Sequence, residues 1–215
     1  MIPLLHDFDG ETVLVLGGGT VGARKARRFA REARVVVVSP SFADAEFGDV
    51  ERVRATVDRD EVEDWLDRVD PALVVAATDD ADLNEAVESA ARARGVLVNR
   101  TDTHGSRDSG SVVVPATVRD DPVVVAVSSG GTSPALSKYL RESIEDDLAG
   151  AGAMAELTGY LREELQARDV PPETRRRVVR DVVRSPDVWT LLRTGTTNLR
   201  QIARDVLSDR ALDEP

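Results

Sequence analysis

The first hundred residues alternate unbroken apolar runs with stretches of helical periodicity. Four apolar runs predict buried strands, at residues 12–16, 34–38, 72–77 and 96–98. A weaker run at residues 53–57 predicts a fifth strand. Three stretches between them predict helices, at residues 21–32, 61–69 and 80–94. Near-continuous apolar strands separated by helices are typical of a parallel sheet covered on both faces. The expected fold class is therefore α/β, with a Rossmann-like doubly wound sheet.

The pattern changes after residue 109. Two β-branched runs at residues 111–118 and 122–127 predict a β-hairpin. From Ser133 onward the pattern is helical, with Ser133 as a helix N-cap and Pro134 in the first helical position. A hairpin outside the parallel sheet would expose unpaired strand edges, which predicts dimerisation through this part of the chain. We expect three regions: a Rossmann-like domain at 1–109, a β-rich dimerisation region at 110–149 and a helical domain at 150–215.

The charge balance narrows the possible partners. The 215 residues include 39 acidic and 28 basic residues, which gives a net charge of -11. Such a chain repels nucleic acid, so nucleic-acid binding is not expected. There is no cysteine, which excludes disulfides and thiolate metal sites. No apolar run is long enough to cross a membrane, and the N-terminus does not resemble a signal peptide, so we expect a cytoplasmic protein.

An acidic, arginine-rich composition favours a halophilic source, such as a haloarchaeon. A GC-rich genome is the alternative explanation for the arginines. Of the 28 basic residues only Lys25 and Lys138 are lysines, so 28 − 2 leaves 26 arginines. If the halophile interpretation is correct, the chain loses folded structure at low salt, because repulsion within a net charge of -11 is no longer screened. Circular dichroism before and after dialysis into dilute buffer tests this prediction. An unchanged spectrum would contradict it.

A glycine-rich motif follows the first predicted strand and opens the first predicted helix. Gly17, Gly19 and Gly22 match the G-x-G-x-x-G pattern, in which glycines permit a tight turn, close approach of a pyrophosphate and close helix–strand packing. The alternative is a glycine turn that only packs. The acidic residue expected about 20 residues later for a ribose is missing, because Ser39-Pro40-Ser41 follows the second strand. These residues alone therefore do not distinguish NAD from NADP.

Polar residues also follow the next two predicted strands at the same sheet edge, where ligands of such folds bind. One group is Thr78-Asp79-Asp80, of which one residue is expected to cap the next helix. The other group contains Arg100, Asp102 and His104. Asp102 is a candidate proton acceptor, with a plain Asx-turn as the alternative. His104 has no partner at metal-ligand spacing, so no resident metal site is expected.

Ser128 to Pro134 forms a serine- and glycine-rich loop that leaves a strand and opens a helix. Its backbone amides and hydroxyls suit an anion, either carboxylate or phosphate. The loop is not a nucleotide-binding P-loop, since no lysine follows the glycines.

Four segments in this order resemble the precorrin-2 dehydrogenase / sirohydrochlorin ferrochelatase family, the N-terminal module of siroheme synthase. They are VLVLGGGTVGARKA, AATDDADLN, VNRTD and VAVSSGGTSPALSKYLRE. The resemblance implies a homodimer that oxidises precorrin-2 to sirohydrochlorin with NAD, with ferrous iron as a further substrate in members that also make siroheme. It implies the following site residues: for NAD, Gly17, Gly19, Thr20, Val21, Gly22, Pro40, Ser41, Thr78 and Asp79; for catalysis, Asp102; and for the tetrapyrrole, Ser128, Gly130, Gly131 and Arg100.

The chain departs from the family pattern at Arg100, which replaces a usually apolar residue. The tetrapyrrole carries many carboxylates, and the basic residues expected nearest to it are Arg24, Arg100, Arg107 and Arg119. Two other classes of protein remain open. A nucleotide-sensing regulatory module of the potassium-transport type shares the glycine motif, but it typically keeps the acidic residue that Ser39 replaces. A helical adaptor built on residues 135–208 has no positive evidence.

Overall fold

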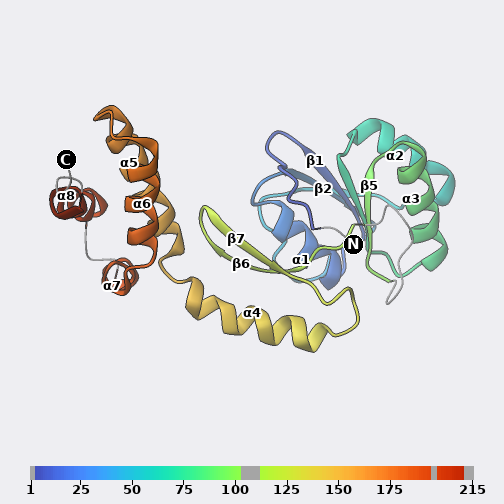
Figure 1. Ribbon diagram of the computed structural model, residues 1–215. Coiled ribbons are helices and arrows are strands. Elements are labelled where there is room, and N and C mark those ends of the chain that lie inside the picture. The colour runs from blue at the N-terminus through green and yellow to red at the C-terminus, as the bar shows by residue number, and fades with distance from the viewer. Residues whose placement is uncertain (1–2, 103–111, 195–197, 211–215) are drawn as a thin grey trace. The chain divides into compact units, whose positions relative to one another are not determined.

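The computed structural model describes residues 3–102, 112–194 and 198–210. It divides into two compact units (Figure 1). Unit 1 comprises Met1–Val114 together with Gly130–Thr132, and unit 2 comprises Pro115–Ser129 and Ser133–Pro215. Among the described residues, no helix is both long and apolar enough to cross a membrane.

Unit 1 contains a five-stranded parallel sheet in the order β3-β2-β1-β4-β5. The strands are β1 (Thr12–Leu16), β2 (Arg34–Ser39), β3 (Glu51–Arg54), β4 (Leu73–Ala76) and β5 (Leu97–Arg100). The strand order reverses between the neighbouring strands β1 and β4, because the chain continues from β1 to β2 on one side and from β4 to β5 on the other. In folds of this kind, ligands bind outside the carboxyl ends of the strands at this switch point. The predicted doubly wound α/β fold is therefore confirmed.

Helices cover both faces of this sheet, as Figure 1 shows. Alternate residues of each strand point to opposite faces, so two apolar clusters form. On one face, Val13, Val15 and their neighbours pack against α1 (Thr20–Phe29). On the other, Leu14 and Leu16 pack against α2 (Val62–Val69) and α3 (Ala81–Ala93). Burial on both faces explains why the strands are apolar without alternation.

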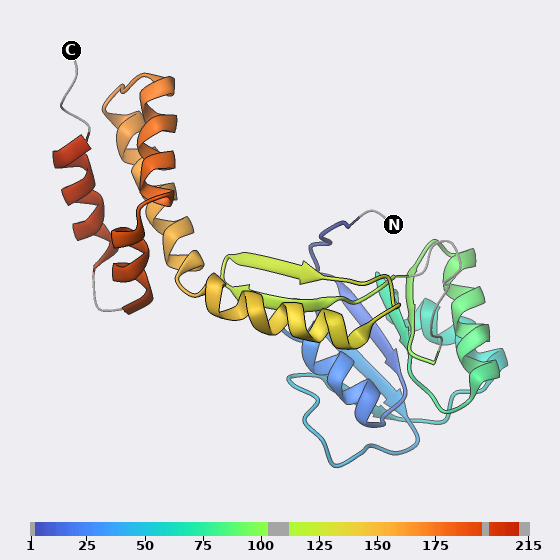
Figure 2. The same cartoon turned by 60° about the horizontal axis from the view of Figure 1, so that its bottom comes forward.

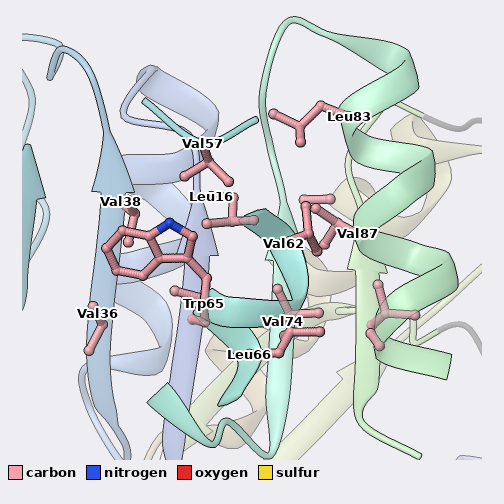
Figure 3. Packing of buried hydrophobic residues seen from close by; sticks show 14 residues of the cluster. Leu16, Val36, Val38, Val57, Val62, Trp65, Leu66, Val74, Leu83 and Val87 are labelled. Atoms are coloured by element: carbon pink, nitrogen blue, oxygen red, sulfur yellow. The ribbon is translucent and has the colours of Figure 1, made fainter. Parts of the chain in front are cut away.

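Trp65 of α2 lies among the aliphatic side chains of the second face (Figure 3). It packs with Val36 and Val38 of β2 and with Val57. Val57 also explains an error in the predicted strand at residues 53–57. The sheet uses Glu51–Arg54 instead, and the chain then leaves the sheet so that Val57 can cover this core. A one-turn helix, η1 (Arg59–Glu61), leads from there into α2.

Unit 2 begins with the antiparallel hairpin of β6 (Ala116–Asp120) and β7 (Val123–Val127). The predicted hairpin is confirmed, but its first strand is shorter than the 111–118 expected. Val112 instead donates its amide to the Val98 carbonyl and accepts from the Asn99 side chain, at 2.8 and 2.7 Å, so it is hydrogen-bonded to the edge strand β5.

The rest of unit 2 is helical, as the sequence predicts. It contains α4 (Pro134–Leu148), α5 (Ala151–Ala167), α6 (Pro172–Val183), α7 (Pro186–Thr194) and α8 (Leu199–Arg210). Ser133 caps α4 by accepting from the Leu136 amide, and Pro134 takes the first position as predicted. Helices α5 to α8 share one apolar core centred on Leu157, Leu161 and Leu165, and they group together in Figure 2.

Candidate functional site

The glycine loop joins β1 to α1 at the switch point of the sheet. Gly17 has φ of +119°, and a Cβ there would lie 2.2 Å from the Ala77 carbonyl oxygen at the end of β4. A Cβ on Gly22 would lie 2.0 Å from the Gly17 carbonyl oxygen. Both positions therefore need glycine, which agrees with the tight turn expected at the first glycine and the close helix–strand packing expected at the last.

Gly19 differs, because the space in front of it is open. A Cβ built on Gly19 meets no atom within 4 Å, and the residue is exposed. It is the N-cap of α1, it makes no side-chain cap, and no acidic residue stands in the first helical turn. The free amides and the positive end of the helix dipole therefore face open space, beside exposed Thr20 and half-buried Val21. This arrangement fits a dinucleotide pyrophosphate, so the residues present suit NAD.

The loop after β2 packs directly on the glycine loop. A Cβ on Gly18 would lie 2.2 Å from the Ser41 carbonyl oxygen and 2.9 Å from the Ser39 hydroxyl oxygen. The Gly18 carbonyl accepts from the Ala43 amide at 2.8 Å. Pro40 and Ser41 are exposed there, next to the predicted cofactor loop. The sequence interpretation omitted Gly18, although three consecutive glycines were the available signal.

The three polar residues that follow β4 have different roles. Asp80 caps α3 by accepting from the amides of Asp82 and Leu83 at 2.9 and 3.0 Å. Thr78 is held by Asn84, whose side chain accepts from its hydroxyl at 2.7 Å and donates to its carbonyl at 3.0 Å. Asp79 is exposed at the edge. The expectation that one of the three residues caps the helix is confirmed, and that residue is Asp80.

After β5, Asp102 forms a two-point ion pair with Arg100. The Arg100 Nε and Nη2 atoms donate to the two carboxylate oxygens at 3.0 and 2.8 Å. The guanidinium also reaches Glu88 of α3 at 3.2 Å, and Glu88 in turn pairs with Arg92 at 2.6 Å. Arg100 and Glu88 are almost buried, with side chains 13% and 11% exposed, whereas that of Asp102 is 26% exposed. A buried charge needs such partners.

The Arg100 guanidinium holds the pKa of Asp102 below its usual value, and a weaker contribution from Asn84 acts in the same direction. Partial burial opposes this shift without cancelling it. Asp102 is therefore a carboxylate anion at neutral pH. A carboxylate with a lowered pKa is a weaker proton acceptor, but it stabilises positive charge that develops nearby.

We expect Arg100→Leu to raise the pKa of Asp102, because the main group favouring its anion is removed. The lowered pKa in the folded state means that the ion pair stabilises the fold above the ordinary carboxylate pKa. This contribution is lost as the pH falls through the folded pKa. Carbon NMR titration of the Asp102 carboxyl, assigned with Asp102→Asn, measures the shift. Arg92→Gln is the control, since Arg92 pairs with Glu88. An unmoved Asp102 pKa in Arg100→Leu would contradict the prediction.

The serine and glycine loop follows β7. Gly130 and Gly131 have φ of +65° and +84°, a region that favours glycine. Ser129 holds the loop, because its hydroxyl donates to the Ser133 carbonyl at 2.9 Å and accepts from the Ser133 amide at 3.1 Å. Ser128, Gly130 and Gly131 are exposed. Their binding of a tetrapyrrole stays a prediction.

Four of the predicted loops therefore lie at one edge of the sheet in unit 1: the loops after β1, β2, β4 and β5. Sequence reasoning missed two polar residues that support them, Asn84 and Glu88, both buried on α3. Their signal was a polar residue on the apolar face of a predicted helix. Arg24 is exposed on α1 and Arg119 on β6. His104 and Arg107 lie outside the described residues.

Two family models match the chain. A model described as putative NAD(P)-binding matches residues 4–116, and one described as sirohaem biosynthesis protein central matches residues 120–147.

The similar curated proteins include one of about the length of this chain and others about twice as long. A precorrin-2 dehydrogenase from Methanosarcina barkeri is 32% identical over 87% of this chain and 85% of its own length. A siroheme synthase from Stutzerimonas stutzeri is 35% identical over 96% of this chain, and one from Pseudomonas aeruginosa is 35% identical over 99% of it. The chain spans only 44% and 43% of those two proteins.

Among solved structures, one described as SirC, precorrin-2 dehydrogenase, has a TM-score of 0.71 at 21% identity. The match covers 97% of this chain and 100% of that one. At this identity the likeness concerns the fold, which is the same over nearly the whole length.

Proposed function

Because the chain belongs to the family of precorrin-2 dehydrogenases and siroheme synthases, we propose that it oxidises precorrin-2 to sirohydrochlorin, with NAD as hydride acceptor. The observation that carries the proposal is the open, uncapped N-terminus of α1 at Gly19, at the same sheet edge as Asp102. The dinucleotide would bind at the N-terminus of α1, and Asp102 supplies a charged side chain for the chemistry.

When bound, NAD supplies the redox chemistry by accepting a hydride from a bridging carbon of precorrin-2. The amides at the start of α1 hold the pyrophosphate, and Pro40, Ser41, Thr78 and Asp79 border the cofactor from the neighbouring loops. Loss of hydride leaves positive charge on the macrocycle, which then loses a ring proton. The Asp102 carboxylate stabilises that charge in the transition state and takes up the proton or passes it to water.

Arg100 and the loop of Ser128, Gly130 and Gly131 are proposed to receive carboxylates of the tetrapyrrole. The guanidinium of Arg100 donates to Asp102 through Nε and Nη2 and to Glu88 through Nη1, so a tetrapyrrole carboxylate would bind its remaining N–H groups. Ferrous iron is a proposed further substrate, which would be inserted into sirohydrochlorin after its pyrrole protons are lost.

Anaerobic incubation with precorrin-2 and NAD, followed by absorption spectroscopy, tests the function. We expect formation of sirohydrochlorin and reduction of NAD in equal amounts, and the same assay with ferrous or cobaltous ion tests metal insertion. Binding of NAD without turnover would favour the nucleotide-sensing alternative instead. Failure of NAD and NADP to raise the melting temperature would contradict both nucleotide-dependent functions.

The chain is further proposed to be a homodimer through residues 110–149. Helix α4 has no buried residue, and it exposes Leu136, Tyr139 and Leu140, with Tyr139 65% exposed. The strands of the adjacent hairpin are mostly half-buried. Apolar side chains gathered on one exposed helix are typical of an interaction surface, and a second copy of this chain would cover them.

We expect Tyr139→Glu to convert the dimer into a monomer, because a charge would be buried in the interface. Light scattering in molar salt measures the mass. Leu191→Glu is the matched control, since Leu191 is also exposed but lies on α7. A monomeric unmodified protein, or loss of the dimer in both variants, would contradict an interface on α4.

A further inference from the structure

Arg54 stands beside the place where a dinucleotide-binding fold holds the adenosine ribose. In such folds an acidic residue at the end of the second strand binds the ribose 2′-hydroxyl of NAD. Here β2 ends at Ser39, and β3 ends at Arg54, which is paired in register with Ser39. The last residue of each strand therefore lies at the carboxyl edge of the sheet, on the side of the glycine loop that should receive the adenosine.

No carboxylate occupies the ribose position. Ser39 is 7% exposed, and its hydroxyl oxygen would lie 2.9 Å from a Cβ on Gly18, so its side chain is directed at the glycine loop. The next four residues, Pro40 to Ala43, contain no acidic side chain. The nearest acidic residue, Asp44, stands five positions beyond the end of β2, so no carboxylate at the strand end itself would repel a 2′-phosphate.

The Arg54 guanidinium reaches across to this same loop. Its Nη1 atom donates to the Pro40 carbonyl at 3.4 Å, and its central carbon lies 5.9 Å from the centre of the Phe42 ring. Within the described residues, Arg54 forms no salt bridge with a carboxylate. One long hydrogen bond to a carbonyl leaves most of its five N–H donors available.

We propose that Arg54 forms a subsite for the 2′-phosphate of NADP, so that the chain binds NADP as well as NAD. An arginine near the end of the second strand is the usual way in which this fold accommodates the additional phosphate. Arginine suits it because the planar guanidinium donates two parallel hydrogen bonds to phosphate oxygens. The Phe42 ring limits the positions of the side chain, which lowers the entropy lost on binding.

This inference rests on the proposed function for the location of the dinucleotide, and direct binding separates the two. Calorimetric titrations of the full chain with NAD and with NADP, at one salt concentration, give the two dissociation constants. We expect the unmodified protein to bind NADP no more than about tenfold more weakly than NAD. Arg54→Gln should weaken NADP binding by about tenfold or more and leave NAD binding within about twofold.

Arg52→Gln is the matched control. Arg52 stands two residues earlier on β3 and also lies over Phe42, at 5.7 Å, so its replacement removes the same charge and a similar ring contact. We expect its NADP affinity to stay within about twofold of that of the unmodified protein. The inference is overturned if the unmodified protein binds NADP more than about tenfold more weakly than NAD, if Arg54→Gln weakens both nucleotides equally, or if Arg52→Gln matches Arg54→Gln. Failure to bind either nucleotide would overturn the proposed function as well.

Discussion

A Gly19→Ala protein is expected to fold normally but to lose most of its affinity for NAD. The added methyl group meets no protein atom within 4 Å, so the folded chain accommodates it without strain. It would, however, stand at the uncapped N-terminus of α1, where a pyrophosphate has to approach the backbone. A methyl group forced against a tightly bound group costs about 1–3 kcal/mol, which corresponds to a dissociation constant roughly 5- to 150-fold larger.

Calorimetric titration with NAD measures this effect, and circular dichroism and the melting temperature report the fold. Gly159→Ala is the matched control, because a Cβ on Gly159 also meets nothing within 4 Å but lies in the middle of α5. That variant should bind NAD normally and gain about 0.5–1 kcal/mol of stability. Normal NAD affinity in folded Gly19→Ala would mean that the glycines serve packing only.

Gly22→Ala, in the same motif, is expected to have the opposite effect and to destabilise the fold. Its Cβ would lie 2.0 Å from the Gly17 carbonyl oxygen, so α1 would have to move away from β1. The two substitutions therefore separate a glycine required by a ligand from one required by the fold. The motif in the sequence assigned both roles, but only the structure shows that Gly18 also packs tightly, against Ser41.

The sheet could be predicted because its strands are buried on both faces. Thr12–Leu16 has the predicted bounds, since both of its neighbours and the helices on each face require apolar residues. The edge strand β3 was placed two residues too late, because Val53 and Val57 have the same spacing as a half-buried strand. Only the packing of Val57 with Trp65 distinguishes the two possibilities, and this contact depends on how the following helix α2 packs on the sheet rather than on the local alternation.

The candidate site could be predicted only as loops at one edge, not as a network. Glu88 and Arg100 are 12 residues apart on a helix and a strand, and no local pattern predicts that they form an almost buried ion pair. Arg100 in turn sets the protonation state of Asp102. The sequence indicates Asp102 only as a candidate proton acceptor, and the structure adds an ion pair that favours its anion.

Asp102→Asn is therefore expected to lower the turnover of precorrin-2 by roughly two to four orders of magnitude, the usual contribution of a positioned acid or base. Asparagine keeps the size of the side chain but can accept only one of the two hydrogen bonds from Arg100, and it removes the charge that would stabilise the oxidised macrocycle. The Michaelis constant should change far less, because binding common to the ground state and the transition state is retained. Asp102→Ala should act similarly and remain folded, since the side chain is on a partly exposed loop. Single-turnover absorption measurements with saturating NAD isolate the chemical step.

Glu88→Gln separates chemistry from a general weakening of the ion-pair network. Glu88 contacts the same Arg100 guanidinium as Asp102 does, but it lies on α3 and has its own partner in Arg92. This variant should lose stability, because it removes a charge from an almost buried pair, while its turnover stays within about tenfold of the unmodified protein. Equal losses of turnover in Glu88→Gln and Asp102→Asn would assign the effect to Arg100 and its position.

Near-normal oxidation in both Asp102 variants would make Asp102 a turn residue, with proton loss going to water. Loss of iron insertion alone would assign Asp102 to metal insertion and leave hydride transfer to the positioning of NAD by the glycine loop.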